Sequence, residues 1–214
     1  MTNSEILSHI DHTLLRADAT ISEIFALCDE ATEYGTASVC LPPSYVSAVR
    51  GKYPKLNICT VIGFPLGYAA TSVKLAELLQ ANTDGADEFD VVINLGAVKN
   101  GDFAAVTAEL EVLRTAAAGK VLKVIIETCY LTTDEKVSMC EIVTSVKADY
   151  IKTSTGFGSA GAELADIALF CKHIGASVKI KASGGIRTRE AMEDFLSAGC
   201  DRLGTSSAVK VLIG

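Results

Sequence analysis

The chain has 214 residues, 49% of them hydrophobic, so it is long enough to bury one substantial core, and a single domain over residues 1–214 is expected. Charged residues make up 21% and the formal net charge is −7, so no basic face is available for a polyanion, and nucleic acid is excluded as a partner. No apolar run approaches the roughly 20 residues that cross a bilayer, and the first residues lack a targeting pattern, so no membrane contact and a cytoplasmic location are expected.

Short β-rich runs alternate with longer segments in which apolar residues recur at helical spacing, beginning with a short helix at the amino end. A typical helical stripe contains Ile21, Ile24, Leu27, Cys28 and Ala31 on one face. The eight predicted strands are Ile10 to Leu15, Thr36 to Leu41, Asn57 to Gly63, Glu88 to Asn94, Lys123 to Thr128, Tyr150 to Thr155, Ser177 to Ser183 and Arg202 to Thr205.

Eight alternating strand and helix units predict an α/β fold, a parallel (β/α)8 TIM barrel. A doubly wound open sheet is the competing fold, but its strands are covered on both faces and should be apolar throughout. The segment Glu88 to Asn94 instead alternates an oily face with a mixed face that carries Asp90. Lys152 and Lys181 lie on similar mixed faces, so we expect these three charges in the upper interior of the barrel.

A lysine inside a strand is costly to bury, and Lys152 therefore needs a partner or a task. A carboxylate that neutralises it would be a purely structural explanation. A second inward lysine, Lys181, disfavours protonation of both amines, so one becomes a free nucleophile that can form a Schiff base with a carbonyl carbon. Asp90 is the candidate for moving the protons of this reaction, and ion pairing with Lys181 is compatible with that task.

Two glycine-containing turns follow the last two strands, where TIM barrels commonly bind phosphate. Gly184 and Gly185 lie in the first turn, while Gly204, Ser206 and Ser207 lie in the second, at the start of a helix. Backbone N–H groups and serine hydroxyls in these positions predict a phosphorylated ligand.

The three histidines, His9, His12 and His173, lack metal-ligand spacing, so we expect no metal and no cofactor. The seven cysteines have no CxxC pair and lie in apolar segments, which predicts buried, reduced thiols. They are Cys28, Cys40, Cys59, Cys129, Cys140, Cys171 and Cys200.

Several segments, in order and at similar spacing over nearly the whole chain, resemble the deoxyribose-phosphate aldolase family. They are Ile10 to Leu15, Ser38 to Pro43, Val61 to Gly67, Lys123 to Thr128, Lys152 to Phe157, Lys181 to Thr188 and Arg202 to Ser207. The resemblance implies reversible cleavage of 2-deoxy-D-ribose 5-phosphate to acetaldehyde and D-glyceraldehyde 3-phosphate, with a phosphosugar as partner and a possible homodimer.

The resemblance also implies roles for single residues: Lys152 as the Schiff-base lysine, Lys181 as the lysine that tunes it, and Asp90 as the proton-relay carboxylate. Phosphate or substrate contacts are expected at Gly156, Gly184, Gly185, Gly204, Ser206 and Ser207. Supporting positions are Asp11, Thr13, Cys40 and Lys123, although packing explains Cys40 equally well. Lys123 and Glu127 share a predicted strand face, so an ion-pair network is expected there.

The chain departs from the family pattern at two places. Phe157 stands where some members have a lysine close to the phosphate, which could alter phosphate affinity, and the chain ends at Gly214 without the terminal tyrosine that assists proton transfer in some members. Two alternatives stay open: another Schiff-base phosphosugar aldolase, with a longer substrate, and a non-catalytic phosphosugar-binding barrel. A metal-dependent aldolase is disfavoured because no histidine cluster is present.

Overall fold

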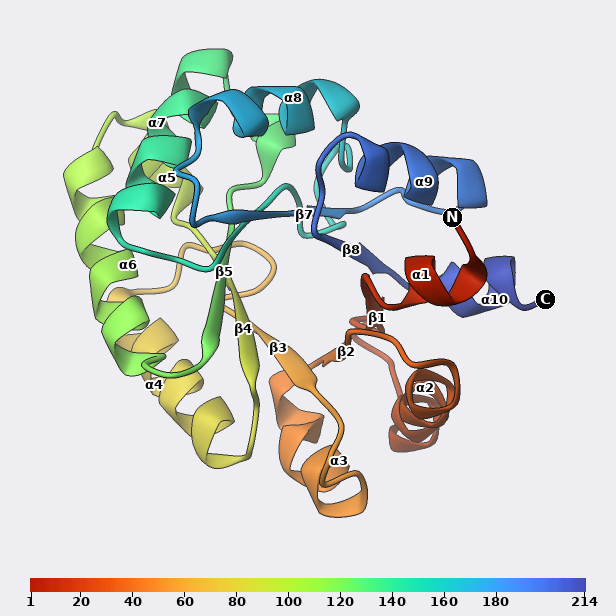
Figure 1. Cartoon of the computed structure of the whole chain (residues 1–214). Coiled ribbons are helices and arrows are strands. Elements are labelled where there is room, and N and C mark those ends of the chain that lie inside the picture. The colour runs from red at the N-terminus through yellow and green to blue at the C-terminus, as the bar shows by residue number, and fades with distance from the viewer.

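Eight parallel strands close into a barrel in the computed structural model, which describes all 214 residues (Figure 1). The strands follow one another in chain order, and β8 pairs with β1 to complete the ring. The predicted barrel is therefore confirmed, and the open sheet is excluded. The strands are β1 (Ile10–Thr13), β2 (Ser38–Leu41), β3 (Ile58–Ile62), β4 (Glu88–Val92), β5 (Val121–Ile125), β6 (Tyr150–Lys152), β7 (Lys179–Ser183) and β8 (Arg202–Thr205).

All eight predicted strands are present, but most of them are shorter than predicted. The strand that is shortened most is the one predicted from Tyr150 to Thr155, because β6 already ends at Lys152. β5 starts two residues earlier than predicted, at Val121, and ends at Ile125. Polar residues after each strand thus belong to loops at the carboxyl end of the barrel, where they are free to turn toward a ligand.

The helices form the outer layer and surround the strands (Figure 1). The predicted short helix at the amino end, α1, contacts α10, and the two termini lie on the same side of the molecule. No helix combines the length and the apolar character needed to span a bilayer. The α-helices are α1 (Asn3–Leu7), α2 (Ile21–Tyr34), α3 (Val46–Lys52), α4 (Thr71–Thr83), α5 (Leu95–Lys99), α6 (Phe103–Ala116), α7 (Thr133–Ser145), α8 (Leu164–His173), α9 (Arg189–Ser197) and α10 (Ala208–Leu212), with 3-10 turns η1 (Pro43–Tyr45) and η2 (Thr128–Tyr130).

Local signals set the ends of α2. Thr20 and Glu23 form a reciprocal capping box at its start, and Gly35 ends it in the left-handed conformation. The predicted stripe is buried from Ile24 onward, whereas Ile21, in the first turn, is 38% exposed. Capping therefore fixes where the helix begins, and its apolar stripe fixes which face meets the barrel.

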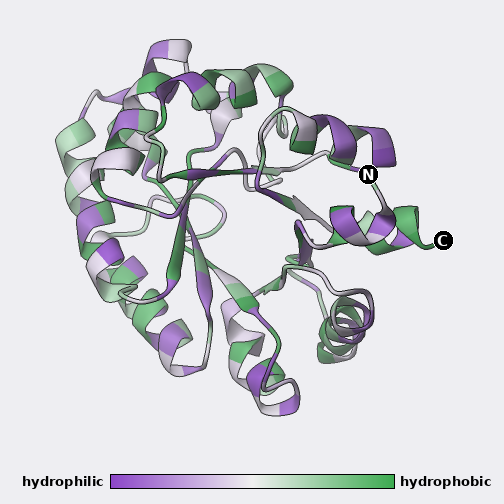
Figure 2. Cartoon of the chain, viewed as in Figure 1, coloured by the Kyte–Doolittle hydropathy of each residue, from purple (hydrophilic) through white to green (hydrophobic).

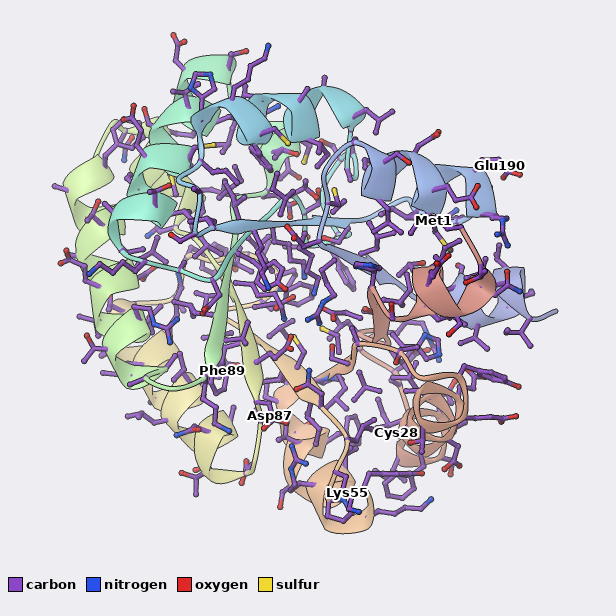
Figure 3. All side chains as sticks on the ribbon, viewed as in Figure 1. Met1, Cys28, Lys55, Asp87, Phe89 and Glu190 are labelled. Carbon is purple, nitrogen blue, oxygen red and sulfur yellow. The ribbon has the colours of Figure 1, made fainter.

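The two faces of each strand have different environments. On β4, Phe89 and Val91 face outward into the apolar layer beneath the helices, whereas Asp90 faces the barrel interior. Hydrophilic residues consequently occur along the strands as well as on the helices (Figure 2), and side chains fill the space that the strands enclose (Figure 3). Five cysteines are buried as predicted, but Cys129 is half-buried and Cys171 is exposed, because it lies on the solvent side of α8.

Candidate active site

The strand register brings four charged side chains together in the barrel interior. Asp90 on β4 is paired with Lys123 on β5, and Lys152 on β6 is paired with Lys181 on β7. All four are at least 97% buried. Strand parity and register, both properties of the backbone, are thus sufficient to build this cluster.

Asp90 contacts all three lysines of the cluster. Its Oδ2 atom accepts hydrogen bonds from Lys152 Nζ and Lys181 Nζ, each at 2.7 Å, and its Oδ1 atom accepts one from Lys123 Nζ at 2.8 Å. Lys152 and Lys181 therefore share one oxygen atom, so any change in the charge of one amine acts directly on the other.

A second set of charged groups lies deeper in the barrel. Asp11 on β1 pairs with Lys181, and also accepts hydrogen bonds from Ser38 Oγ at 2.7 Å and from Arg202 at 2.5 Å. Glu88 lies 2.5 Å from Lys123 Nζ. The predicted position of Asp11 beside the site is thus explained by its ion pair with Lys181.

Burial and charge act in opposite directions on these groups. Burial alone would raise the pKa of the Asp90 carboxyl, but the ammonium groups of Lys123, Lys152 and Lys181 outweigh burial and hold this pKa well below its usual range. The pKa of Asp11 is lowered in the same way, chiefly by Lys181. Burial alone would lower the pKa of Lys181, but Asp11 and Asp90 raise it above the usual lysine value. Both carboxylates and Lys181 are therefore charged at neutral pH.

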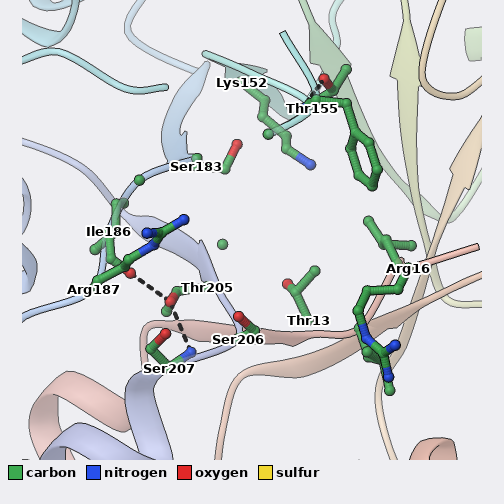
Figure 4. Close-up of a pocket in the computed structure, with 17 residues that line it drawn as sticks. Thr13, Arg16, Lys152, Thr155, Ser183, Ile186, Arg187, Thr205, Ser206 and Ser207 are labelled. Carbon is green, nitrogen blue, oxygen red and sulfur yellow. Dashed lines mark hydrogen bonds between the residues drawn. The ribbon is translucent and has the colours of Figure 1, made fainter. Parts of the chain in front are cut away.

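A cavity of about 290 Å³ opens above this cluster at the carboxyl end of the barrel. In Figure 4, Lys152 extends into it from one side, while Arg187, Ser206 and Ser207 lie on the other. This size is at the lower end of the range for ligand pockets, about 300–1,000 Å³. The cavity therefore suits a small ligand that reaches from the lysine to the serine loop.

The predicted site residues divide into two groups. Eight line the cavity: Thr13, Lys152, Gly156, Gly184, Gly185, Gly204, Ser206 and Ser207. The other five are buried below it and do not line it: Asp11, Cys40, Asp90, Lys123 and Lys181. Lys152 is the one member of the lysine cluster that belongs to both the cavity wall and the buried network.

The two glycine-containing loops are tied together by Thr205. Its hydroxyl donates to the Ile186 carbonyl oxygen at 2.7 Å and accepts from the Ser207 N–H at 3.0 Å (Figure 4). Gly184 and Gly185 have φ of +84° and +79°, which turns the first loop in a way that other residues disfavour. The helix that was predicted to start at Ser206 and Ser207 begins instead at Ala208 and has five residues. Ser207 occupies its N-cap position.

Gly204 has a steric reason to lack a side chain. A Cβ atom there would lie 3.2 Å from Cε of Lys181 and 3.0 Å from Cβ of Ser183. Gly204 therefore provides space for the Lys181 side chain inside the barrel, in addition to lining the cavity.

Cys40, Cys59 and Asp90 have potential metal-ligand atoms within 4.8 Å of one another. Asp90 is already bound by three ammonium groups, and Cys59 donates to Asp90 Oδ1 at 3.1 Å. A divalent cation would meet strong repulsion from these lysines, so the electrostatics disfavour a metal. Burial in the apolar group with Cys59 and Val61 gives Cys40 a packing role.

Among the residues near the cavity that were not predicted from the sequence, three bear directly on its chemistry. Arg187 and Thr155 line it, and Glu127 supports it from below by accepting hydrogen bonds from Thr155. The expected network of Lys123 with Glu127 is wrong: β5 ends at Ile125, so strand alternation no longer holds at Glu127, and Lys123 pairs with other carboxylates. Arg187 follows Gly185 closely in the chain, so its charge was an available signal.

Comparisons with known proteins match nearly the whole chain to one family of aldolases. Residues 6–206 match the model of the DeoC/LacD family aldolases. A protein named deoxyribose-phosphate aldolase from Clostridium botulinum (strain Eklund 17B / Type B) is 57% identical over 215 residues, covering 100% of this chain and 97% of that protein. A protein of the same name from Clostridioides difficile (strain 630) is 52% identical over 208 residues, covering 97% and 95%.

A solved structure of deoxyribose phosphate aldolase from Aeropyrum pernix, described as a unique tetramer, matches with a TM-score of 0.92 at 34% identity, covering 99% of this chain and 91% of that chain. A closed parallel barrel with a lysine in a cavity at its carboxyl end defines a barrel enzyme. The chain belongs to the DeoC/LacD family of aldolases and is a lyase.

Asp90→Asn should reduce the free energy of unfolding at pH 7 by about 3–5 kcal/mol, because three buried lysines lose their shared carboxylate. The folded-state pKa of Asp90 lies below its unfolded value, so its stabilisation is complete above pH ~4 and is lost as pH falls further. The variant should therefore lose less stability than the wild type between about pH 4 and pH 2. Urea denaturation across this range measures both effects, and equal acid dependence in the two proteins would contradict the role of this carboxylate.

Proposed function

We propose that the protein catalyses the reversible aldol cleavage of 2-deoxy-D-ribose 5-phosphate to acetaldehyde and D-glyceraldehyde 3-phosphate, with Lys152 forming the Schiff base. The position of Lys152 carries this proposal, because it alone among the clustered lysines lines the cavity. The names of the relatives from Clostridium botulinum and Clostridioides difficile support the choice of substrate.

The balance of buried charge favours Lys152 as the reacting lysine. The network has one more basic side chain than it has carboxylates, and an uncompensated buried charge costs several kcal/mol. Lys152 contacts one carboxylate, whereas Lys181 contacts two and Lys123 contacts three, so forming the imine at Lys152 sacrifices the least ion pairing. The basic groups are Lys123, Lys152, Lys181 and Arg202, and the carboxylates are Asp11, Glu88 and Asp90.

After losing its proton, the Lys152 amine attacks C1 of the open-chain sugar, and loss of water gives the imine. When protonated, the imine accepts the electron pair of the breaking C2–C3 bond as an enamine, while the C3 hydroxyl loses its proton and becomes the aldehyde of D-glyceraldehyde 3-phosphate. Protonation of the enamine at C2 and hydrolysis then release acetaldehyde and restore Lys152. These steps use side chains and water, and no cofactor takes part.

Asp90 serves this chemistry as a shared acceptor for two amines. Because its pKa is held well below the usual range, it is a weak base and does not retain a proton. It keeps Lys181 charged and orients Lys152, and it passes protons between them only transiently. The relay role of Asp90 and the tuning role of Lys181 thus follow from one shared oxygen atom.

The serine and glycine loops suit the phosphate end of the substrate. Backbone N–H groups near Gly184 and Gly185 and the hydroxyls of Ser206 and Ser207 are donors for an anion. Arg187 forms no ion pair with the protein, so its guanidinium is available there. Arg187 thus gives the cavity a cation, although Phe157 replaces the lysine of some family members.

The cavity of about 290 Å³ accommodates a five-carbon chain with its phosphate. The names of the relatives favour this substrate over the longer ketose phosphates of other Schiff-base aldolases. A non-catalytic barrel would gain nothing from burying three lysines around one carboxylate, because each ammonium group must leave water.

We also propose that the barrel forms a homodimer. The Aeropyrum pernix relative, described as a unique tetramer, supports self-association of such a barrel, and the dimer is the smallest assembly of this kind. Light scattering should give twice the 22.5 kDa mass of one chain. The mass of a single chain at micromolar concentration would contradict this assembly.

Lys152→Ala should reduce turnover of 2-deoxyribose 5-phosphate to below about 1% of the wild-type rate, because no other cavity residue can form the imine. Borohydride reduction with acetaldehyde should leave a two-carbon adduct on Lys152 in the wild type and none in the variant, as read by peptide mass spectrometry. Lys172→Ala, at an exposed lysine of α8, is the matched control and should keep both activity and adduct. An adduct on a different lysine, or none on the folded wild type, would overturn the assignment.

Replacing both Ser206 and Ser207 by alanine should raise KM for 2-deoxyribose 5-phosphate by about 10-fold or more, because two hydroxyl donors to the phosphate are lost. Unphosphorylated 2-deoxyribose should be affected much less. Steady-state kinetics with the two sugars provide the comparison, and equal losses would place the phosphate elsewhere.

A further inference from the structure

Glu127 is a buried carboxylate that belongs to no ion pair in the protein. It is 2% exposed and lies between β5 and η2 with φ +52° and ψ +67°, a left-handed conformation that residues with a Cβ atom rarely adopt. Backbone hydrogen bonds hold the residues on both sides of it, because Ile126 N–H donates to the Lys152 carbonyl oxygen at 3.0 Å and Thr128 N–H donates to that of Thr153 at 2.9 Å. Glu127 is therefore fixed beside the strand that carries Lys152.

Both carboxylate oxygens of Glu127 contact the same residue. Oε1 accepts from the backbone N–H of Thr155 at 3.1 Å, and Oε2 accepts from the Thr155 hydroxyl. Gly158 allows the loop to pass close by, since a Cβ atom there would lie 3.2 Å from Cδ of Glu127. This buried group thus acts on one hydroxyl, that of Thr155, a residue that lines the cavity three positions after Lys152.

The Thr155 hydroxyl has only one hydrogen-bonding position left for a ligand, because the protein uses the others. A hydroxyl has one donor and two acceptor lone pairs. The proton of Thr155 Oγ1 is used by Glu127, and one lone pair accepts from Phe157 N–H at 3.0 Å. One lone pair is left for the cavity, so Thr155 can accept a hydrogen bond from a ligand but cannot donate one.

We propose that Glu127 is a positioning residue that fixes Thr155 as an acceptor and so makes the site select substrates with a hydroxyl on the carbon next to the reacting carbonyl. This inference rests on the proposed function. In the synthetic direction the carbonyl oxygen of the incoming aldehyde needs a donor, which Thr155 cannot provide. The hydroxyl on the adjacent carbon is a donor, so the acceptor substrates selected are 2-hydroxyaldehydes.

Glu127→Gln tests the direction of this hydrogen bond with almost no change in shape. The Thr155 N–H requires an oxygen on its side of the introduced amide, which places the NH2 group against Thr155 Oγ1. Thr155 then receives two N–H donors from the protein, and its own proton turns toward the cavity. In this variant a substrate hydroxyl loses its acceptor, and Thr155 becomes a donor that the carbonyl oxygen of either aldehyde can use, so the two aldehydes are discriminated less.

The measurement is the ratio of kcat/KM for glycolaldehyde to kcat/KM for propanal, with acetaldehyde as the donor. The two aldehydes differ by a hydroxyl in place of a methyl group, neither has a phosphate, and differences in their hydration cancel when the ratio is compared between variants. Glu127→Gln should lower this ratio by about 10-fold relative to the wild type, and Thr155→Val should lower it similarly. Thr155→Ser, which keeps the hydroxyl, should preserve most of the ratio.

Glu77→Gln is the matched control, because Glu77 also accepts a backbone N–H from a loop, that of Gly63 at 2.7 Å, but does not line this cavity. Its ratio should equal that of the wild type. Equal losses with both aldehydes in Glu127→Gln would show a merely structural role and overturn the inference, as would an unchanged ratio. A folded wild type that converts neither aldehyde, nor 2-deoxyribose 5-phosphate, would instead overturn the proposed function.

Discussion

The carboxylate of Asp90 permits three lysine side chains to lie inside one barrel. Each ammonium group must leave water, and a single buried acceptor with two oxygens offsets that cost only if all three nitrogens lie within hydrogen-bond distance. The register of β4 to β7 supplies this geometry, since it pairs Asp90 with Lys123 and Lys152 with Lys181. The chemistry proposed for Lys152 therefore depends on strand pairing far more than on any loop.

The barrel divides the site between two sets of elements. Strands β4 to β7 hold Asp90 and the three lysines below the cavity, and the loops after β7 and β8 line the cavity above them. Thr205 ties these two loops to each other. Phe157 lies in a third loop, after β6, so a different residue at this position can change the cavity wall without moving the strands that carry the lysines.

The sequence was sufficient to predict the barrel and the charged cluster, because both follow from strand alternation. Asp90, Lys152 and Lys181 lie within strands, where period two decides the face. Prediction failed where a strand had already ended: β6 stops at Lys152, so Thr155 lines the cavity although continued alternation selects Ser154. Strand ends are set by tertiary packing, and local sequence patterns contain little information about them.

The segment from Lys152 to Phe157 contains both the amine proposed to react and, three residues further on, the hydroxyl proposed to recognise the substrate. A strand would have pointed Thr155 to the opposite face from Lys152, so the early end of β6 is what lets both face one cavity. Such a loop needs external support, because it lacks the hydrogen bonds of a sheet. Glu127 provides that support from the loop after β5, and its left-handed backbone is the local cost of reaching beneath Thr155.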